Sequence, residues 1–125
     1  MIPRSTANLN EGDFSWVERD DGLFVPLMLI SKIGGKRSYF YGGIINLATT
    51  KESEIPIGLS ILEYALLHID VFKNNELKVE GNLLSKLEKG LVDEIKHQIS
   101  DLRIGSKSSV WGYRTIYKYA AEVKA

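Results

Sequence analysis

The sequence predicts an α+β domain in which a small antiparallel β-sheet packs against two amphipathic helices. Three runs of branched and aromatic residues, separated by turn residues, occupy positions 14–47 and are typical of strands. Apolar residues then recur at a spacing of three and four over positions 61–69 and 83–102, which is typical of helices. We expect a final aromatic run, residues 109–119, to return to the sheet as a C-terminal strand.

The composition is that of one globular domain. The chain has 125 residues, of which 44% are apolar and 26% charged, and a single hydrophobic core accounts for this length. Residues 1–10 show no hydrophobic period and are expected to form a flexible leader, whereas residues 11–125 form the α+β domain. The longest apolar run, residues 23–30, is too short to span a membrane. Cysteine is absent, which excludes disulfides and thiolate metal sites, and we expect a cytoplasmic protein.

Charge is balanced over the whole chain but unevenly distributed along it. Lys and Arg number 16, as do Asp and Glu, and the zero net charge excludes the strongly basic field of a generic DNA-binding protein. Residues 11–21 contain five acids against Arg19, and residues 103–124 contain five bases against Glu122. These segments are either solvated faces or, for the first, an acidic patch that meets a basic partner.

The predicted sheet begins with a meander of three strands. The first covers residues 14–18 and ends at the turn residues Asp20-Asp21-Gly22, which tolerate positive φ. The second covers residues 23–33 and leads through a second turn, residues 34–37, into a third strand at residues 38–47. Short turns join neighbouring strands, so we expect all three to be antiparallel.

Two features interrupt these strands. Pro26 has no N–H to donate, so the second strand is expected to lie at an edge or to bulge there. Gly42 and Gly43 lie inside the third strand, where they indicate a bulge or a sharp bend.

The first predicted helix begins at Ile61, and its apolar stripe runs to Ile69. Ser60 is a suitable N-cap, and Glu63, three residues further on, completes a capping box. Asn74 and Asn75 are expected to end the helix.

The second predicted helix covers residues 83–102. Asn82 is a candidate N-cap, Gly90 weakens the helix by about 1 kcal/mol relative to alanine, and Gly105 is expected to end it. Residues 76–80, between the two helices, are expected to form a short strand.

The C-terminal segment fits two patterns. As a strand, it places its aromatic residues and its basic residues on opposite faces. As a helix, it places Ile116, Tyr117, Ala120 and Ala121 on one stripe. We favour a strand to Tyr119, followed by a frayed or helical end at residues 120–125.

No assembled catalytic site is recognisable. The two histidines, His68 and His97, both lie in helical patterns, and no G-x-S-x-G motif is present. Glu94 and His97 share a helix face, but one such pair falls short of a di-metal site. The segment Gly34-Gly35-Lys36 fails the spacing of a phosphate loop and is interpreted as a turn. We therefore predict no enzymatic activity, no metal and no cofactor.

Aromatic residues beside basic ones can also mark nucleic-acid platforms. Residues 111–119 carry Arg114 and Lys118 among aromatic side chains. Strand alternation separates the rings from the charges, so nucleic-acid binding is kept only as an alternative, as is ligand binding between the sheet and the helices.

The N-terminal segment resembles a known class of proteins. Residues 11–14 read Glu-Gly-Asp-Phe and residues 21–24 read Asp-Gly-Leu-Phe. This arrangement is similar to the start of small immunity proteins of bacterial polymorphic-toxin and contact-dependent inhibition systems. The resemblance covers about 20 residues of the chain. It implies a non-catalytic protein that binds and neutralises a cognate toxin in the cytoplasm, and it carries no active-site residue.

The acidic segment supports the same expectation from chemistry. Immunity proteins bind through charge complementarity and a few buried aromatic anchors. The residues that we predict to contact a partner are acidic or aromatic: Trp16, Glu18, Asp20, Asp21, Tyr39 and Tyr41. For Trp16, a role as a core anchor between the sheet and the helices is the alternative.

Overall fold

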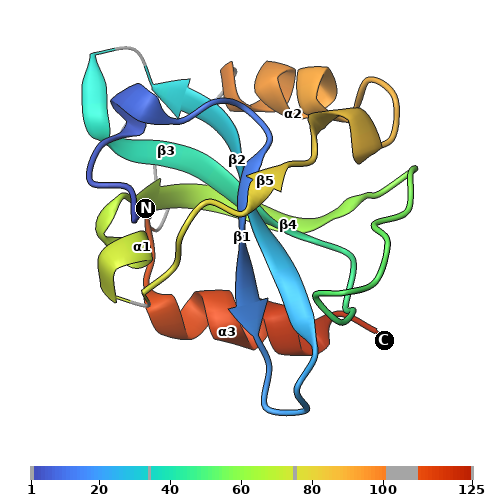
Figure 1. The fold of residues 1–125 in the computed structure, drawn as a ribbon. Coiled ribbons are helices and arrows are strands. Elements are labelled where there is room, and N and C mark those ends of the chain that lie inside the picture. Colours follow the sequence, from blue (N-terminus) through green and yellow to red (C-terminus); the bar gives the residue numbers. More distant parts are fainter. Residues whose placement is uncertain (1, 34, 75, 101–109, 125) are drawn as a thin grey trace.

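A six-stranded sheet with the order β5-β1-β2-β3-β4-β6 runs through the centre of the protein (Figure 1). The computed structural model describes residues 2–33, 35–74, 76–100 and 110–124. Neighbouring strands are antiparallel except β6, which is parallel to β4. Along the chain the elements are η1 (Thr6–Asn8), β1 (Asp13–Glu18), β2 (Phe24–Ile33), β3 (Lys36–Ile45), β4 (Ile61–His68), α1 (Asp70–Asn74), β5 (Gly81–Asn82), η2 (Leu84–Lys86), α2 (Leu91–Ser100), β6 (Val110–Trp111) and α3 (Tyr113–Glu122).

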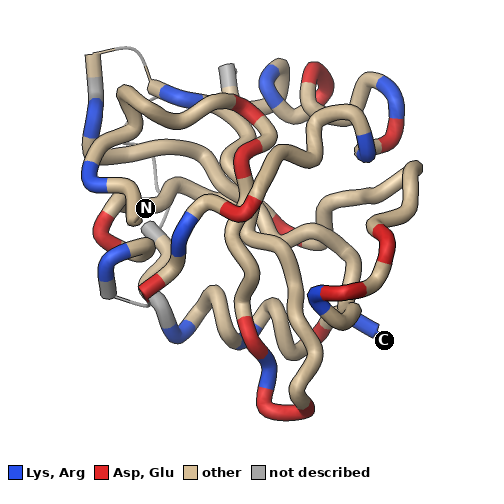
Figure 2. Tube along the Cα trace, in the orientation of Figure 1, with Lys and Arg blue, Asp and Glu red and all other residues tan. Residues whose placement is uncertain are grey.

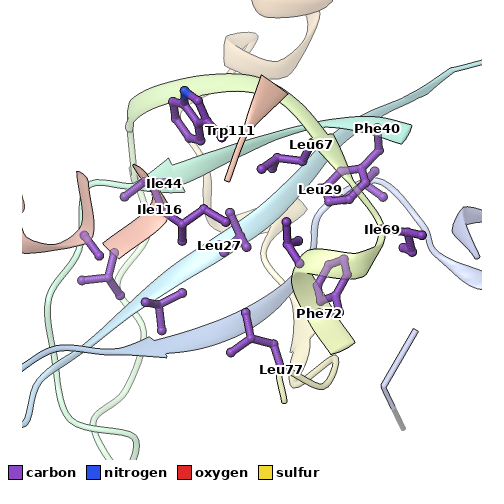
Figure 3. Packing of buried hydrophobic residues seen from close by; sticks show 14 of the residues in the cluster. Leu27, Leu29, Phe40, Ile44, Leu67, Ile69, Phe72, Leu77, Trp111 and Ile116 are labelled. Carbon is purple, nitrogen blue, oxygen red and sulfur yellow. The ribbon is translucent and has the colours of Figure 1, made fainter. Parts of the chain in front are cut away.

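The sheet is covered on both faces, which confirms the predicted α+β class. Along β2, Leu27 and Leu29 face one hydrophobic cluster, whereas Met28 and Ile30 face the other. The first cluster contains residues of α1 and α3, among them Phe72 and Ile116 (Figure 3). The second cluster contains Ile95 of α2. Because successive side chains of a strand point to opposite faces, a strand buried on both sides is apolar at every position.

The N-terminal meander of three antiparallel strands is confirmed. Val17 of β1 pairs with Val25 of β2, and Leu29 of β2 pairs with Gly42 of β3. Pro26 pairs with Trp16 on the β1 side, and the ladder with β3 begins only at Leu27. The proline therefore lies where β2 has no regular partner on its second side, as its missing N–H requires.

The paired glycines of β3 lie at a bulge and at a close contact between strands. The β2–β3 register shifts between Leu29 and Ser31, opposite Gly42. A Cβ built on Gly43 would lie 2.9 Å from the carbonyl oxygen of Glu63 in β4. Glycine is needed here because neighbouring atoms fill the space that a side chain would take.

The first predicted helix is wrong over residues 61–68, because this segment forms β4 and pairs with both β3 and β6. The run is apolar at almost every position, so residues spaced by three and four are apolar in either structure. Ala65 and Leu67 pack into the cluster on one face of the sheet and Tyr64 into the cluster on the other, as strand alternation requires. The helix α1 begins only at Asp70 and ends at Asn74, where the predicted helix was expected to end.

The second predicted helix is much shorter than expected. Gly90 adopts a φ of +80°, and α2 begins at the next residue. Before it, the Asn82 side chain accepts a hydrogen bond from the Leu84 N–H at 2.9 Å, and only the short 3₁₀ turn η2 follows, not a long helix. The predicted end of this helix, at Leu102 and Gly105, lies outside the described residues. The short strand predicted at residues 76–80 does not form, and β5 follows it instead.

The chain returns to the sheet near its C-terminal end, but only through the two residues of β6. The strand predicted to Tyr119 is wrong, because residues 113–122 form α3. Ile116 and Ala120 of α3 and Val123, which follows its last residue, are buried and spaced by four and three, so this segment buries a helical stripe and not an alternating strand face. The described residues thus form three α-helices where we predicted two.

Residues 2–10, which we expected to form a flexible leader, contribute to the core. Leu9 is 3% exposed and belongs to the cluster on the α3 side of the sheet. Thr6 is buried as well, and Ser5 caps the 3₁₀ turn η1 by accepting the Ala7 N–H.

Candidate functional site

A surface hollow of about 210 Å³ lies between the β1–β2 hairpin and the C-terminal half of α3. Its lining residues come from these two elements only: Glu18, Arg19, Asp20, Asp21, Tyr117 and Ala121. Three of the four hairpin residues are acidic, and Figure 2 shows acidic residues at the tip of this hairpin. Three of the predicted partner-binding residues, Glu18, Asp20 and Asp21, are therefore brought together.

The hairpin tip is held by its own turn chemistry. Gly22 adopts a φ of +85°, and its N–H donates to the Arg19 carbonyl at 3.0 Å. The Asp21 carboxylate accepts the Leu23 N–H at 3.1 Å. The sequence Asp-Asp-Gly thus folds locally as the turn that we predicted.

Arg19 fixes the hairpin to α3. Its side chain is only 14% exposed, and Nη1 donates to the carbonyl oxygens of Ala120, at 3.3 Å, and of Val123. Nη2 donates to the Asp21 carboxylate at 2.8 Å. A cation at the C-terminal end of a helix is favourable because the unpaired carbonyls there carry partial negative charge.

The electrostatic state of the site follows from these contacts. The hydrogen bond from the Leu23 N–H, together with the Arg19 guanidinium, holds the pKa of Asp21 below its ordinary value. Burial raises the pKa of the Tyr117 phenol, and the negative charge of Glu18 raises it further. Tyr117 therefore lies within the field of the acidic hairpin while remaining 37% exposed.

Two of the acids have no partner within the part of the chain that the structure describes. Glu18 and Asp20 are both exposed, and no hydrogen bond or ion pair joins either carboxylate to a described residue. Asp21, in contrast, is paired with Arg19. The charge that the hairpin offers to a partner therefore comes from Glu18 and Asp20.

Trp16 lies on the sheet face that α2 covers. Its ring makes edge-to-face contacts with Phe14 at 5.0 Å and with Phe24 at 6.3 Å between centroids. The side chain is half-buried and packs against the cluster on this face. This placement fits the core-anchor alternative and leaves part of the indole accessible.

Tyr39 and Tyr41 lie apart from the acidic hairpin. They are in the middle of β3, where Tyr41 pairs with Ser31 near one end of β2, whereas the acids lie at the opposite end of β2. Ten strand residues span about 30 Å, so the six predicted residues do not form one surface. The Tyr39 ring packs edge-to-face on His68, whose Nδ1 accepts the Asp70 N–H at 3.1 Å.

Three residues that line the hollow are not among the predicted partner-binding residues: Arg19, Tyr117 and Ala121. Arg19 was counted only as the base among five acids, and its burial depends on α3, which we had predicted as a strand. Tyr117 and Ala121 lie one helical turn apart, and the helical alternative for this segment placed both on one stripe. That helical stripe is the feature of the sequence that could have placed these two residues side by side.

The described residues hold no group of three or more His, Asp or Glu side chains arranged to bind a metal ion. No helix among them is long and apolar enough to cross a membrane. Comparisons of the chain with protein-family models, curated proteins and solved structures gave no match.

Proposed function

We propose that this protein is a non-catalytic binding module that neutralises a basic cognate toxin domain, in the manner of the cytoplasmic immunity proteins that its N-terminal segment resembles. One observation carries the proposal. Glu18 and Asp20 are exposed and unpartnered among the described residues, and they stand on a hairpin that Arg19 fastens to α3. Acids held on a rigid support favour association with a basic surface at little entropic cost.

The hollow supplies the second part of a protein interface. Binding hot spots combine an aromatic side chain with a surrounding polar rim. Tyr117 is a half-exposed aromatic residue, and the acids of the hairpin line the same hollow. A partner that covers Tyr117 would pair its own basic residues with Glu18 and Asp20.

The size of the hollow favours a protein partner over a small molecule. Small-molecule sites usually enclose about 300–1,000 Å³. The hollow of about 210 Å³ is smaller than this range and is open to solvent. Nucleic acid is disfavoured at this surface because three carboxylates outnumber the one guanidinium, which α3 and Asp21 already occupy.

The experiment is a co-expression pull-down with this protein as tagged bait and the product of the adjacent upstream reading frame as prey. We expect a one-to-one complex that survives moderate salt, together with rescue of growth when that product is toxic. A matched pair of variants locates the interface: Glu18→Lys with Asp20→Lys, and Glu88→Lys with Glu94→Lys on the α2 side. Both pairs change the net charge equally.

We expect the hairpin pair to weaken capture and rescue, and the control pair to leave both intact. Failure of the parent protein to capture the product or to rescue growth would contradict the proposed function. A separate titration with single-stranded RNA and DNA oligonucleotides tests the nucleic-acid alternative, which requires binding that weakens steeply as salt rises.

A further inference from the structure

The outer edge of β1 is only partly paired. Strand β5 pairs with Asp13 and Phe14, and the Glu80 N–H extends this contact by donating to the Phe14 carbonyl at 2.8 Å. Before Glu80 the chain turns onto the sheet face that α1 and α3 cover, where Leu77 and Val79 pack. The Ser15 hydroxyl donates to the Lys78 carbonyl on that face and leaves the outward backbone groups of β1 without this partner. Beyond Phe14, no described strand pairs with β1 on this side.

The direction of the backbone groups on this edge follows from the β1–β2 register. The Arg19 N–H donates to the Leu23 carbonyl, so residues 19, 17 and 15 direct their backbone groups toward β2. The alternate residues 14, 16 and 18 point away from β2, as the bond between Phe14 and Glu80 shows. Trp16 and Glu18 therefore present two N–H and two C=O groups outward, without a backbone partner among the described residues.

We propose that this edge pairs with an extended segment of the basic partner, which adds a strand to the sheet beside β1. This inference rests on the proposed function and specifies how the partner is held. Strand addition satisfies the unpaired backbone groups of an edge, and side chains beside the new strand provide selectivity.

The side chains beside the edge define the partner segment. Glu18 lies on the edge and Asp20 follows it, so the segment carries Lys or Arg opposite Glu18. The half-exposed indole of Trp16 offers an apolar surface to the residue opposite it. A second copy of this chain is a poorer occupant, because pairing two β1 edges would bring two acidic hairpins together.

Amide hydrogen exchange on the complex with the upstream-frame product tests this inference. In the free protein, we expect the amides of Trp16 and Glu18 to exchange faster than those of Ser15 and Val17, which β2 holds. In the complex, we expect the exchange of Trp16 and Glu18 to slow by at least about tenfold. A complex in which these two amides are not protected would overturn the edge pairing and leave the proposed function standing.

Other outcomes are distinguishable. If no complex forms, the proposed function and the edge pairing both fail. If the amides of Trp16 and Glu18 are protected from exchange without the partner, and this protection rises with protein concentration, the edge pairs with a second copy of the chain. That result would overturn the proposed pairing with a segment of the partner.

A substitution provides a second readout. Glu18→Pro removes the carboxylate side chain and an outward N–H, but no hydrogen bond between β1 and β2. Glu18→Ala is its matched control because it removes the same side chain but keeps that N–H. We expect Glu18→Pro to bind the partner about fivefold more weakly than Glu18→Ala. Equal affinities of two folded variants would contradict strand addition, and the exchange measurement decides the matter if Glu18→Pro does not fold.

Discussion

Arg19 in the β1–β2 hairpin donates through Nη1 to the carbonyl oxygen of Ala120, 3.3 Å away at the end of α3. The same nitrogen donates to the carbonyl of Val123. These bonds join segments that are about a hundred residues apart, and they place Tyr117 beside Glu18. The candidate site exists because this contact holds the hairpin against the helix.

Arg19→Met should therefore destabilise the protein while keeping most of the buried stem. Hydrogen bonds from a charged donor contribute about 1.5–3 kcal/mol each, so we expect the free energy of unfolding to fall by about 2 kcal/mol in urea titrations. Arg19→Lys is the control: it keeps the charge but lacks the planar fork, and should recover only part of the loss. Unchanged stability of Arg19→Met would show that the contact does not hold the hairpin.

The lowered pKa of Asp21 predicts a specific acid dependence of stability. A carboxyl whose pKa is lower in the folded state stabilises the protein above its unfolded pKa, near 3.8, and loses this contribution as the pH falls through the folded value. Thermal unfolding at neutral pH and below pH 3.8 should show that the advantage of the parent over Asp21→Asn shrinks in acid. A difference between the two proteins that is independent of pH would contradict this account.

The placement of Tyr117 can be tested by titrating its phenol with ring-labelled tyrosine and NMR. Burial raises the pKa of Tyr117 first, and Glu18 adds to it. Glu18→Gln should therefore lower this pKa, but not to the ordinary value of 10.0, because the burial remains. If the Tyr117 phenol has the same pKa in the parent and in Glu18→Gln, Tyr117 does not lie beside Glu18, and the placement is contradicted.

Adjacent leucines distinguish the strand in the structure from the helix that the sequence suggested. In β4, Leu67 is fully buried and Leu66 is half-buried. Leu67→Ala should cost about 2–5 kcal/mol of unfolding free energy, and Leu66→Ala clearly less. If Leu66→Ala lowers the free energy of unfolding more than Leu67→Ala does, the segment is a helix, because the predicted helix has Leu66 and not Leu67 on its apolar stripe.

The N-terminal half of the fold could be predicted because its signals are local. The turn at Asp20-Asp21-Gly22 and the missing N–H of Pro26 act within a few residues, so the meander follows from them. The later half depends on tertiary contacts. Residues 61–68 are apolar at nearly every position, and only pairing with β3 and β6 makes them a strand.

The acids of the candidate site could be predicted as a charged turn, but their surroundings could not. Tyr117 reaches the hairpin only when residues 113–122 are helical, and we had favoured a strand there. Tyr39 and Tyr41 were grouped with the acids by residue type alone. The predicted meander already separates them, because its two turns lie at opposite ends of β2.

Association kinetics of the complex with the upstream-frame product test the central claim most directly. Glu18→Lys with Asp20→Lys is compared with Glu88→Lys and Glu94→Lys, which make the same change in net charge on the α2 side of the sheet. At low salt, the hairpin pair should slow association by about tenfold or more, and the control pair by less than about threefold. Equal association rates for the two variants would contradict the assignment of the hairpin as the surface that the partner meets.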